Sequence, residues 1–106
     1  MKEELQDLID LLHERKCSCV LRNGEIYTFE RRGVEDLYDL LREQPGLLLG
    51  ADVADKVVGK GAAALMVLGR VRRVYADVLS EPAYGLLFQT GISVSYGRLV
   101  SAIRNR

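Results

Sequence analysis

The chain has little of the chemistry that marks several broad classes of protein. It contains two cysteines and one histidine among 106 residues, and 15 lysines and arginines balance 15 aspartates and glutamates. A net charge of zero gives no support for a nucleic-acid partner or an anionic membrane surface. With so few cysteines and no export signal, we expect a reducing, cytoplasmic location.

Long apolar runs are also missing. The longest, from Ala62 to Leu68, is far shorter than the roughly 20 residues that a membrane span needs. The N-terminal stretch MKEELQDLIDLLHERK is acidic and amphipathic, which is not the pattern of a signal peptide. Because linkers, repeats and low-complexity segments are absent too, the sequence predicts a single domain over residues 1–106.

What is present is an alternation of helical and extended patterns. Helices are predicted over residues 2–15, 33–46, 55–69 and 82–90, with a short final helix from about Arg98. Strands are predicted on either side of the Asn23-Gly24 turn within 17–30, and over 47–53, 72–79 and 92–96. Asp55 is expected to cap the helix over 55–69.

The order of these patterns predicts an α/β fold. Strands separated by helices favour crossover connections and a mainly parallel sheet, to which the first hairpin adds an antiparallel pair. We therefore predict a three-layer α-β-α sandwich around a mixed five-stranded sheet in the order 2-1-3-4-5. In such sheets ligands bind beyond the carboxyl ends of the parallel strands, where helix N-termini point into a shared crevice.

Two helices are expected to begin at this crevice, near Asp55–Lys60 and Ser80–Ala83. Lys60 would add positive charge to the partial charge of the first helix end. Glycine costs about 1 kcal/mol relative to alanine inside a helix, so Gly59 and Gly61 suggest a close approach of some other group. Either tight packing against the sheet or contact with a ligand would account for them.

Several segments together are similar to one protein family. DKVVGKGAAALMV, VYADVLSEPA, GISVSY and the terminal IRNR resemble the prokaryotic family called domain of unknown function 1893, and the likeness covers nearly the whole chain. The resemblance implies a cytidine-deaminase-like fold and a cytosolic protein. It implies no established reaction.

The same resemblance bears on zinc. Active deaminases hold the metal with a His or Cys on one helix and Pro-Cys-x-x-Cys on the next, while a Glu shuttles protons. Pro82 matches the proline, but Ala83 and Leu86 stand where the two cysteines would be. Val58 and Lys60 stand near the positions of the His or Cys and of the Glu. These side chains cannot replace the ligands or the carboxylate, so neither zinc deamination nor a cofactor is expected.

Other candidate chemistry has an ordinary structural explanation. Cys17 and Cys19 alternate on a predicted strand, so both thiols should face one side. Together with a solvent-facing His13 they would still be one ligand short of a closed zinc site. Asp52 and Asp55 could form an acid–base pair, although helix capping also explains Asp55.

We hypothesise that the crevice binds a small anionic or nucleotide-like ligand. The candidate ligand-binding residues are Asp55, Lys56, Gly59, Lys60, Asp77, Ser80, Glu81 and Pro82. On the strand over 72–79, Asp77 should share a face with Arg73 and Tyr75 and lie near the crevice. Two alternatives remain open: a metal-independent enzyme that uses Lys60 with Asp55 or Glu81, and a structural module, such as a homodimer, with a vestigial crevice.

Overall fold

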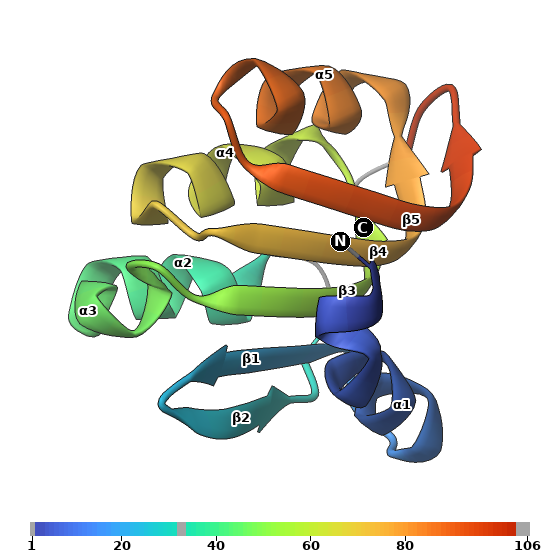
Figure 1. Ribbon diagram of the computed structural model, residues 1–106. Coiled ribbons are helices and arrows are strands. Elements are labelled where there is room, and N and C mark those ends of the chain that lie inside the picture. The colour runs from blue at the N-terminus through green and yellow to red at the C-terminus, as the bar shows by residue number, and fades with distance from the viewer. Residues whose placement is uncertain (1, 32–33, 104–106) are drawn as a thin grey trace.

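The computed structural model describes residues 2–31 and 34–103, in which helices lie on both faces of a central sheet (Figure 1). The helical elements are η1 (Lys2–Leu5), α1 (Gln6–Glu14), α2 (Glu35–Glu43), α3 (Pro45–Leu48), α4 (Lys60–Gly69) and α5 (Glu81–Gln89). The strands are β1 (Cys19–Asn23), β2 (Glu25–Phe29), β3 (Asp52–Val58), β4 (Arg73–Ser80) and β5 (Ser93–Val100). None of the helices in these residues is long and apolar enough to cross a membrane.

The described strands form one mixed sheet in the order β2-β1-β3-β4-β5. β1 is antiparallel to both β2 and β3, whereas β4 is parallel to β3 and to β5. Gly24 makes the tight turn of the first hairpin at a φ of +77°, a conformation that glycine adopts without strain. The three-layer α/β architecture and the strand order predicted from the sequence are therefore confirmed.

Each face of the sheet has its own buried apolar cluster. α1 covers one face (Figure 1), where Leu8, Ile9 and Leu12 pack with Val20 of β1 and Tyr75 of β4. The larger cluster on the other face joins α2, α4 and α5 to the sheet; its members include Leu37, Leu40, Val53, Met66, Val74, Ala83 and Leu87. Because successive strand residues point to opposite faces, one strand supplies side chains to both clusters.

The structure corrects the predicted boundaries around β3. Residues 47–53 are not the buried strand, since Pro45–Leu48 form a helix and the strand is Asp52–Val58. The helix expected over 55–69 begins only at Lys60, so the prediction that Asp55 caps it is wrong. β3 lies between β1 and β4, and its end is rich in β-branched valine, so sheet pairing outweighs the capping preference of aspartate.

The C-terminal end of the sheet also differs from the prediction. The short helix expected from about Arg98 is wrong, because β5 continues to Val100. Its pairing with β4 extends as far as Ser80, which is level with Val100. β5 is therefore as long as β4 and forms one edge of the sheet in the described part of the chain.

Candidate functional site

Two helices begin side by side at the carboxyl ends of the parallel strands. β3 ends at Val58 and β4 ends at Ser80, and Val58 is level with Leu79 in the sheet. α4 therefore starts beside α5, and the two helices pack together. The convergence of two helix N-termini expected from the sequence is confirmed.

The start of α4, which we call the α4 tip (Gly59–Ala62), has no side-chain cap. Gly59 is the N-cap residue, with extended backbone at φ −99° and ψ −175°, and the first turn contains no acidic residue. The first N–H groups of α4 therefore have no side-chain acceptor. Lys60 is exposed and makes no ion pair within residues 2–31 and 34–103. Its charge adds to a helix end that carries roughly half an elementary positive charge.

The N-terminal N–H donors of α5 are largely accounted for by residues of the helix start itself. Ser80 is buried, and its hydroxyl accepts a hydrogen bond of 3.2 Å from the Ala83 N–H. Pro82 has no N–H to offer, so little unsatisfied donor capacity remains there. Glu81 is exposed in the first turn of α5, and α5 starts beside α4. Ser80 and Pro82 thus have structural roles, while Glu81 stays accessible.

Packing does not explain the glycines of the α4 tip. A Cβ added at Gly59 would lie 3.5 Å from Ile103, and one added at Gly61 would lie 3.7 Å from Val34, both ordinary van der Waals contacts. Neither glycine has a positive φ. Steric packing therefore does not require glycine at either position, although Ile103 lies over Gly59 and Val34 lies over Gly61.

Asp55 lies inside the sheet rather than at the α4 tip. It is level with Cys19 of β1 and is 6 % exposed. Its carboxylate accepts a long hydrogen bond of 3.4 Å from the Val57 N–H. Burial raises the pKa of Asp55 to about 7, against the hydrogen bonds that it receives. Burial likewise raises the pKa of the Cys19 thiol, helped by the nearby Asp55 charge.

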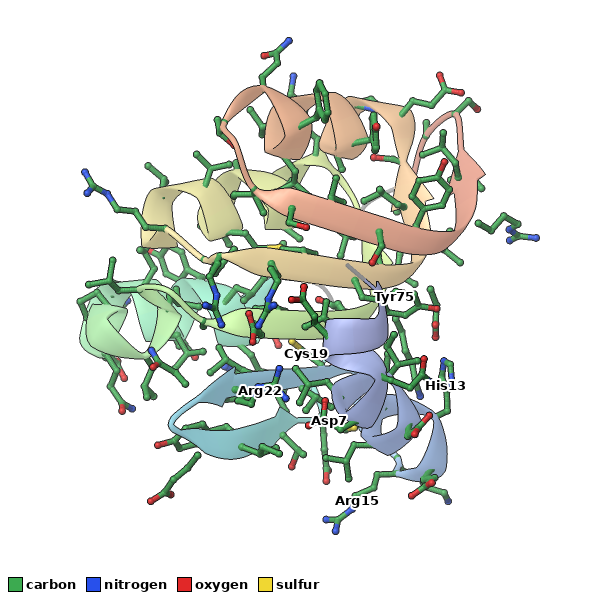
Figure 2. The ribbon with its side chains drawn as sticks, viewed as in Figure 1. Asp7, His13, Arg15, Cys19, Arg22 and Tyr75 are labelled. Carbon is green, nitrogen blue, oxygen red and sulfur yellow. The ribbon has the colours of Figure 1, made fainter. Side chains whose placement is uncertain are left out.

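Asp77 lies on the α1 face, and it shares that face with Tyr75 as predicted. Its Oδ1 atom accepts a hydrogen bond of 2.7 Å from the Tyr75 hydroxyl and contacts His13 Nε2 at 2.8 Å. Burial, together with this hydrogen bond, raises the pKa of Tyr75 to about 12. Figure 2 shows His13 at the end of α1 and Tyr75 on the sheet beside it. Sequence reasoning missed this contact of His13, because 64 positions separate it from Asp77.

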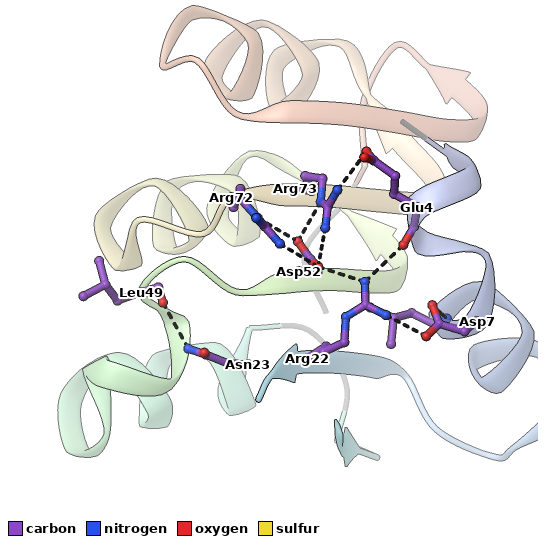
Figure 3. Close-up of polar contacts among 9 residues, drawn as sticks. Glu4, Asp7, Arg22, Asn23, Leu49, Asp52, Arg72 and Arg73 are labelled. Carbon is purple, nitrogen blue, oxygen red and sulfur yellow. Dashed lines mark hydrogen bonds and ion pairs between the residues drawn. The ribbon is translucent and has the colours of Figure 1, made fainter. Parts of the chain in front are cut away.

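Asp52 lies at the centre of an ionic cluster (Figure 3), at the start of β3 and therefore at the end of the sheet opposite to the α4 tip. Asp52 is 1 % exposed, and its carboxylate accepts hydrogen bonds from Arg22, Arg72 and Arg73, the shortest at 2.8 Å. Burial opposes its ionisation, yet the guanidinium hydrogen bonds outweigh burial and hold the pKa of Asp52 well below its usual range. Asp52 therefore forms no acid–base pair with Asp55, whose carboxyl is level with Cys19 instead.

The two cysteines do not face the same side of the sheet. Cys17 belongs to the cluster under α1, whereas Cys19 belongs to the cluster under α2 and α4. β1 begins only at Cys19, after a bend at Ser18, so strand alternation does not extend back to Cys17. Both are buried free thiols.

The predicted site residues therefore separate into two groups. The structure brings Gly59, Lys60, Ser80, Glu81 and Pro82 together at the adjacent starts of α4 and α5. It leaves Asp55 and Lys56 within β3, and Asp77 on the α1 face of β4.

The sheet order and the two adjoining helix starts define a three-layer α/β protein. The chain belongs to the DUF1893 family: the family model for TM1506, a domain of unknown function, matches residues 7–106. The crystal structure of the DUF1893 family protein TM1506 from Thermotoga maritima is similar to all of this chain and to 72 % of that one, with a TM-score of 0.86 at 24 % identity.

A second structural relative is more distant. RibD from Acinetobacter baumannii matches 90 % of this chain and 34 % of its own length, with a TM-score of 0.56 at 15 % identity. At these identities both structural likenesses show the fold alone. No curated protein matches the chain.

The residues present do not fit the zinc of the deaminase framework. Within residues 2–31 and 34–103, no group of three His, Cys, Asp or Glu side chains could hold a metal ion. At the start of α5, Ala83 is fully buried and Leu86 is half-buried, and neither side chain has a donor atom.

Proposed function

We propose that this chain binds a small anionic, nucleotide-like ligand at the α4 tip. The observation that carries the proposal is a helix N-terminus with no side-chain cap and two glycines that its own packing does not require. The N–H groups of the first turn point along the helix axis and suit a phosphate or carboxylate. Lys60 supplies a full positive charge at the same place.

Glu81 narrows the chemistry of the ligand. A carboxylate beside the α4 tip opposes a ligand that is anionic throughout, but it accepts hydrogen bonds from hydroxyl or amino groups. A molecule with an anionic end and neutral donors further along, such as a nucleotide, satisfies both Lys60 and Glu81. Asp55 and Asp77 are outside this proposal, because the fold places their carboxyls elsewhere.

Thermal unfolding with a panel of compounds tests the proposal. The panel contains inorganic phosphate, nucleosides and nucleotides, and we expect nucleotides to raise Tm more than nucleosides. A ligand at about 100 times its Kd stabilises by about 2.7 kcal/mol, which corresponds to roughly 10–20 °C for a domain of this size.

Two variants localise the binding. Lys60→Met should reduce the nucleotide-dependent rise in Tm, and Arg70→Met is the matched control, because Arg70 follows the opposite end of α4. If no compound raises Tm, or if both variants respond equally, the proposal fails.

A further inference from the structure

α5 has a surface that an outer helix does not ordinarily present. Its sequence EPAYGLLFQ contains a single charged residue, Glu81, yet only Ala83 and Leu87 are buried. Phe88 is 65 % exposed. A helix that is apolar on most sides is normally enclosed by other elements. The described part of the chain leaves this apolar surface uncovered.

β5 adds an unprotected sheet edge beside it. In the described sheet β5 pairs only with β4, and Figure 1 shows it as the outermost strand, next to α5. Its eight residues include no proline and one charge, Arg98. The other edge strand, β2, has only five residues and begins with Glu25. Proteins usually shorten or charge an edge strand to prevent pairing, and β5 has neither protection along most of its length.

Aromatic side chains connect the two elements. Tyr84 stacks on Phe88 with ring centroids 5.8 Å apart, and it meets Tyr96 of β5 edge-on at 6.1 Å. α5 and β5 thus hold three of the seven aromatic residues of the chain. Only two of their 17 residues are charged, against 30 of 106 overall. Depletion of charge with enrichment of aromatics is the composition of a protein interface core.

We propose that α5 and β5 form the interface of a homodimer, in which β5 pairs antiparallel with the β5 strand of a second copy. A two-fold axis perpendicular to the sheet satisfies the outer backbone groups of both strands and keeps both α5 helices on one face. With the axis near Tyr96, Arg98 of each copy lies opposite Val94 of the other, so like charges do not meet. The chain's net charge of zero adds no long-range repulsion.

The size of this surface fits a weak dimer. A strand of eight residues is about 26 Å long, and adjacent sheet and helix layers together present a side about 20 Å high. The projected area is about 500 Å² per copy, or about 1,000 Å² in total, which is the lower limit for a specific interface. We therefore expect the dimer to have a dissociation constant in the micromolar range.

Sedimentation equilibrium of the full chain between about 1 and 300 µM tests the proposal. We expect the wild type to shift from 11.9 kDa towards twice that mass as its concentration rises. Phe88→Glu should weaken association by about a hundredfold or more, since each dimer loses two apolar contacts and gains two buried charges. Leu49→Glu is the matched control, because Leu49 is 58 % exposed at a site outside α5 and β5 and should leave association unchanged.

Hydrogen exchange provides a second measurement on the unaltered protein. The outward-facing amides of β5 should exchange more slowly at the high concentration than at the low one, while those of β2 should not change. A wild type that stays at 11.9 kDa, a Phe88→Glu variant that associates normally, or β5 amides insensitive to concentration would overturn the proposal.

Discussion

Replacing Asp55 with asparagine should make the protein more stable above neutral pH and should remove most of its pH dependence between about pH 5 and 8. Burial raises the pKa of this carboxyl from 3.8 to about 7 in the folded state. The folded protein then keeps the proton to a higher pH than the unfolded chain does. As pH rises through this window, burial of the ionised carboxylate lowers the free energy of unfolding progressively. Above about pH 7 this destabilisation is constant.

The magnitude follows from the difference between the two pKa values. A difference of about 3 pKa units, at about 1.4 kcal/mol each, means that the buried carboxylate destabilises the wild type by about 4 kcal/mol at high pH. At pH 5 the destabilisation is only about 1–2 kcal/mol. Asparagine has nearly the same shape and no charge to lose. The gain in unfolding free energy should therefore be about 2–3 kcal/mol larger at pH 8 than at pH 5.

Urea unfolding followed by far-ultraviolet circular dichroism at both pH values measures this gain. Asp10→Asn is the matched control, because Asp10 is an exposed acid on α1 whose carboxylate bonds to Gln6. The control should change stability by less than about 0.5 kcal/mol at either pH. Parallel pH profiles for the wild type and the Asp55 variant would refute the electrostatic account.

Three further substitutions test separate parts of the structure. Gly61→Ala should stabilise the unliganded protein by about 0.5–1 kcal/mol in urea unfolding yet reduce nucleotide binding, and a variant that binds normally would exclude close approach of the ligand. Gly97→Ala should destabilise by about 1–3 kcal/mol, because its Cβ would lie 3.0 Å from the Asp77 backbone oxygen and 3.2 Å from the Tyr75 hydroxyl; an unchanged Tm would show that these contacts relax. Arg73→Met should cost about 2–3 kcal/mol at pH 7. The deficit should shrink below about pH 4, because Asp52 is then protonated in the unfolded chain while its lowered pKa keeps it ionised in the folded wild type; a deficit independent of pH would show lost packing instead.

The order of elements was predictable because it follows from periodicity. Apolar residues at helical spacing and short extended runs alternate along the chain, and the connection rules then leave few sheet orders. The start of α4 was not predictable in the same way. A central strand buried on both faces lacks the alternation that marks its end, and Asp55 before Val57 and Val58 matches a helix cap as well as it matches a buried strand.

The polar contacts were the least accessible to sequence reasoning. His13 and Asp77 meet only because α1 packs across β4, and no local pattern in either segment indicates the other. Asp52 likewise depends on arginines from β1 and from the start of β4. The residues of the α4 tip were singled out because their signals are local: Gly59, Lys60 and Gly61 are consecutive, although the helix start was predicted too early, at Asp55.

Asp55 and the proposed ligand site should influence each other through charge. Asp55 lies four residues before Gly59 on the same extended chain, which places the two roughly 13 Å apart. At an effective dielectric constant of about 20, an anion at that distance opposes ionisation of Asp55 by about 1 kcal/mol. Because such coupling is reciprocal, ionisation of Asp55 should weaken ligand binding about fivefold between pH 6 and 8. Titration of wild type and Asp55→Asn with one nucleotide at both pH values separates this effect from ionisation of the ligand's own phosphate. The variant should lose the additional weakening, and equal pH dependence in the two proteins would place the ligand outside the electrostatic reach of Asp55.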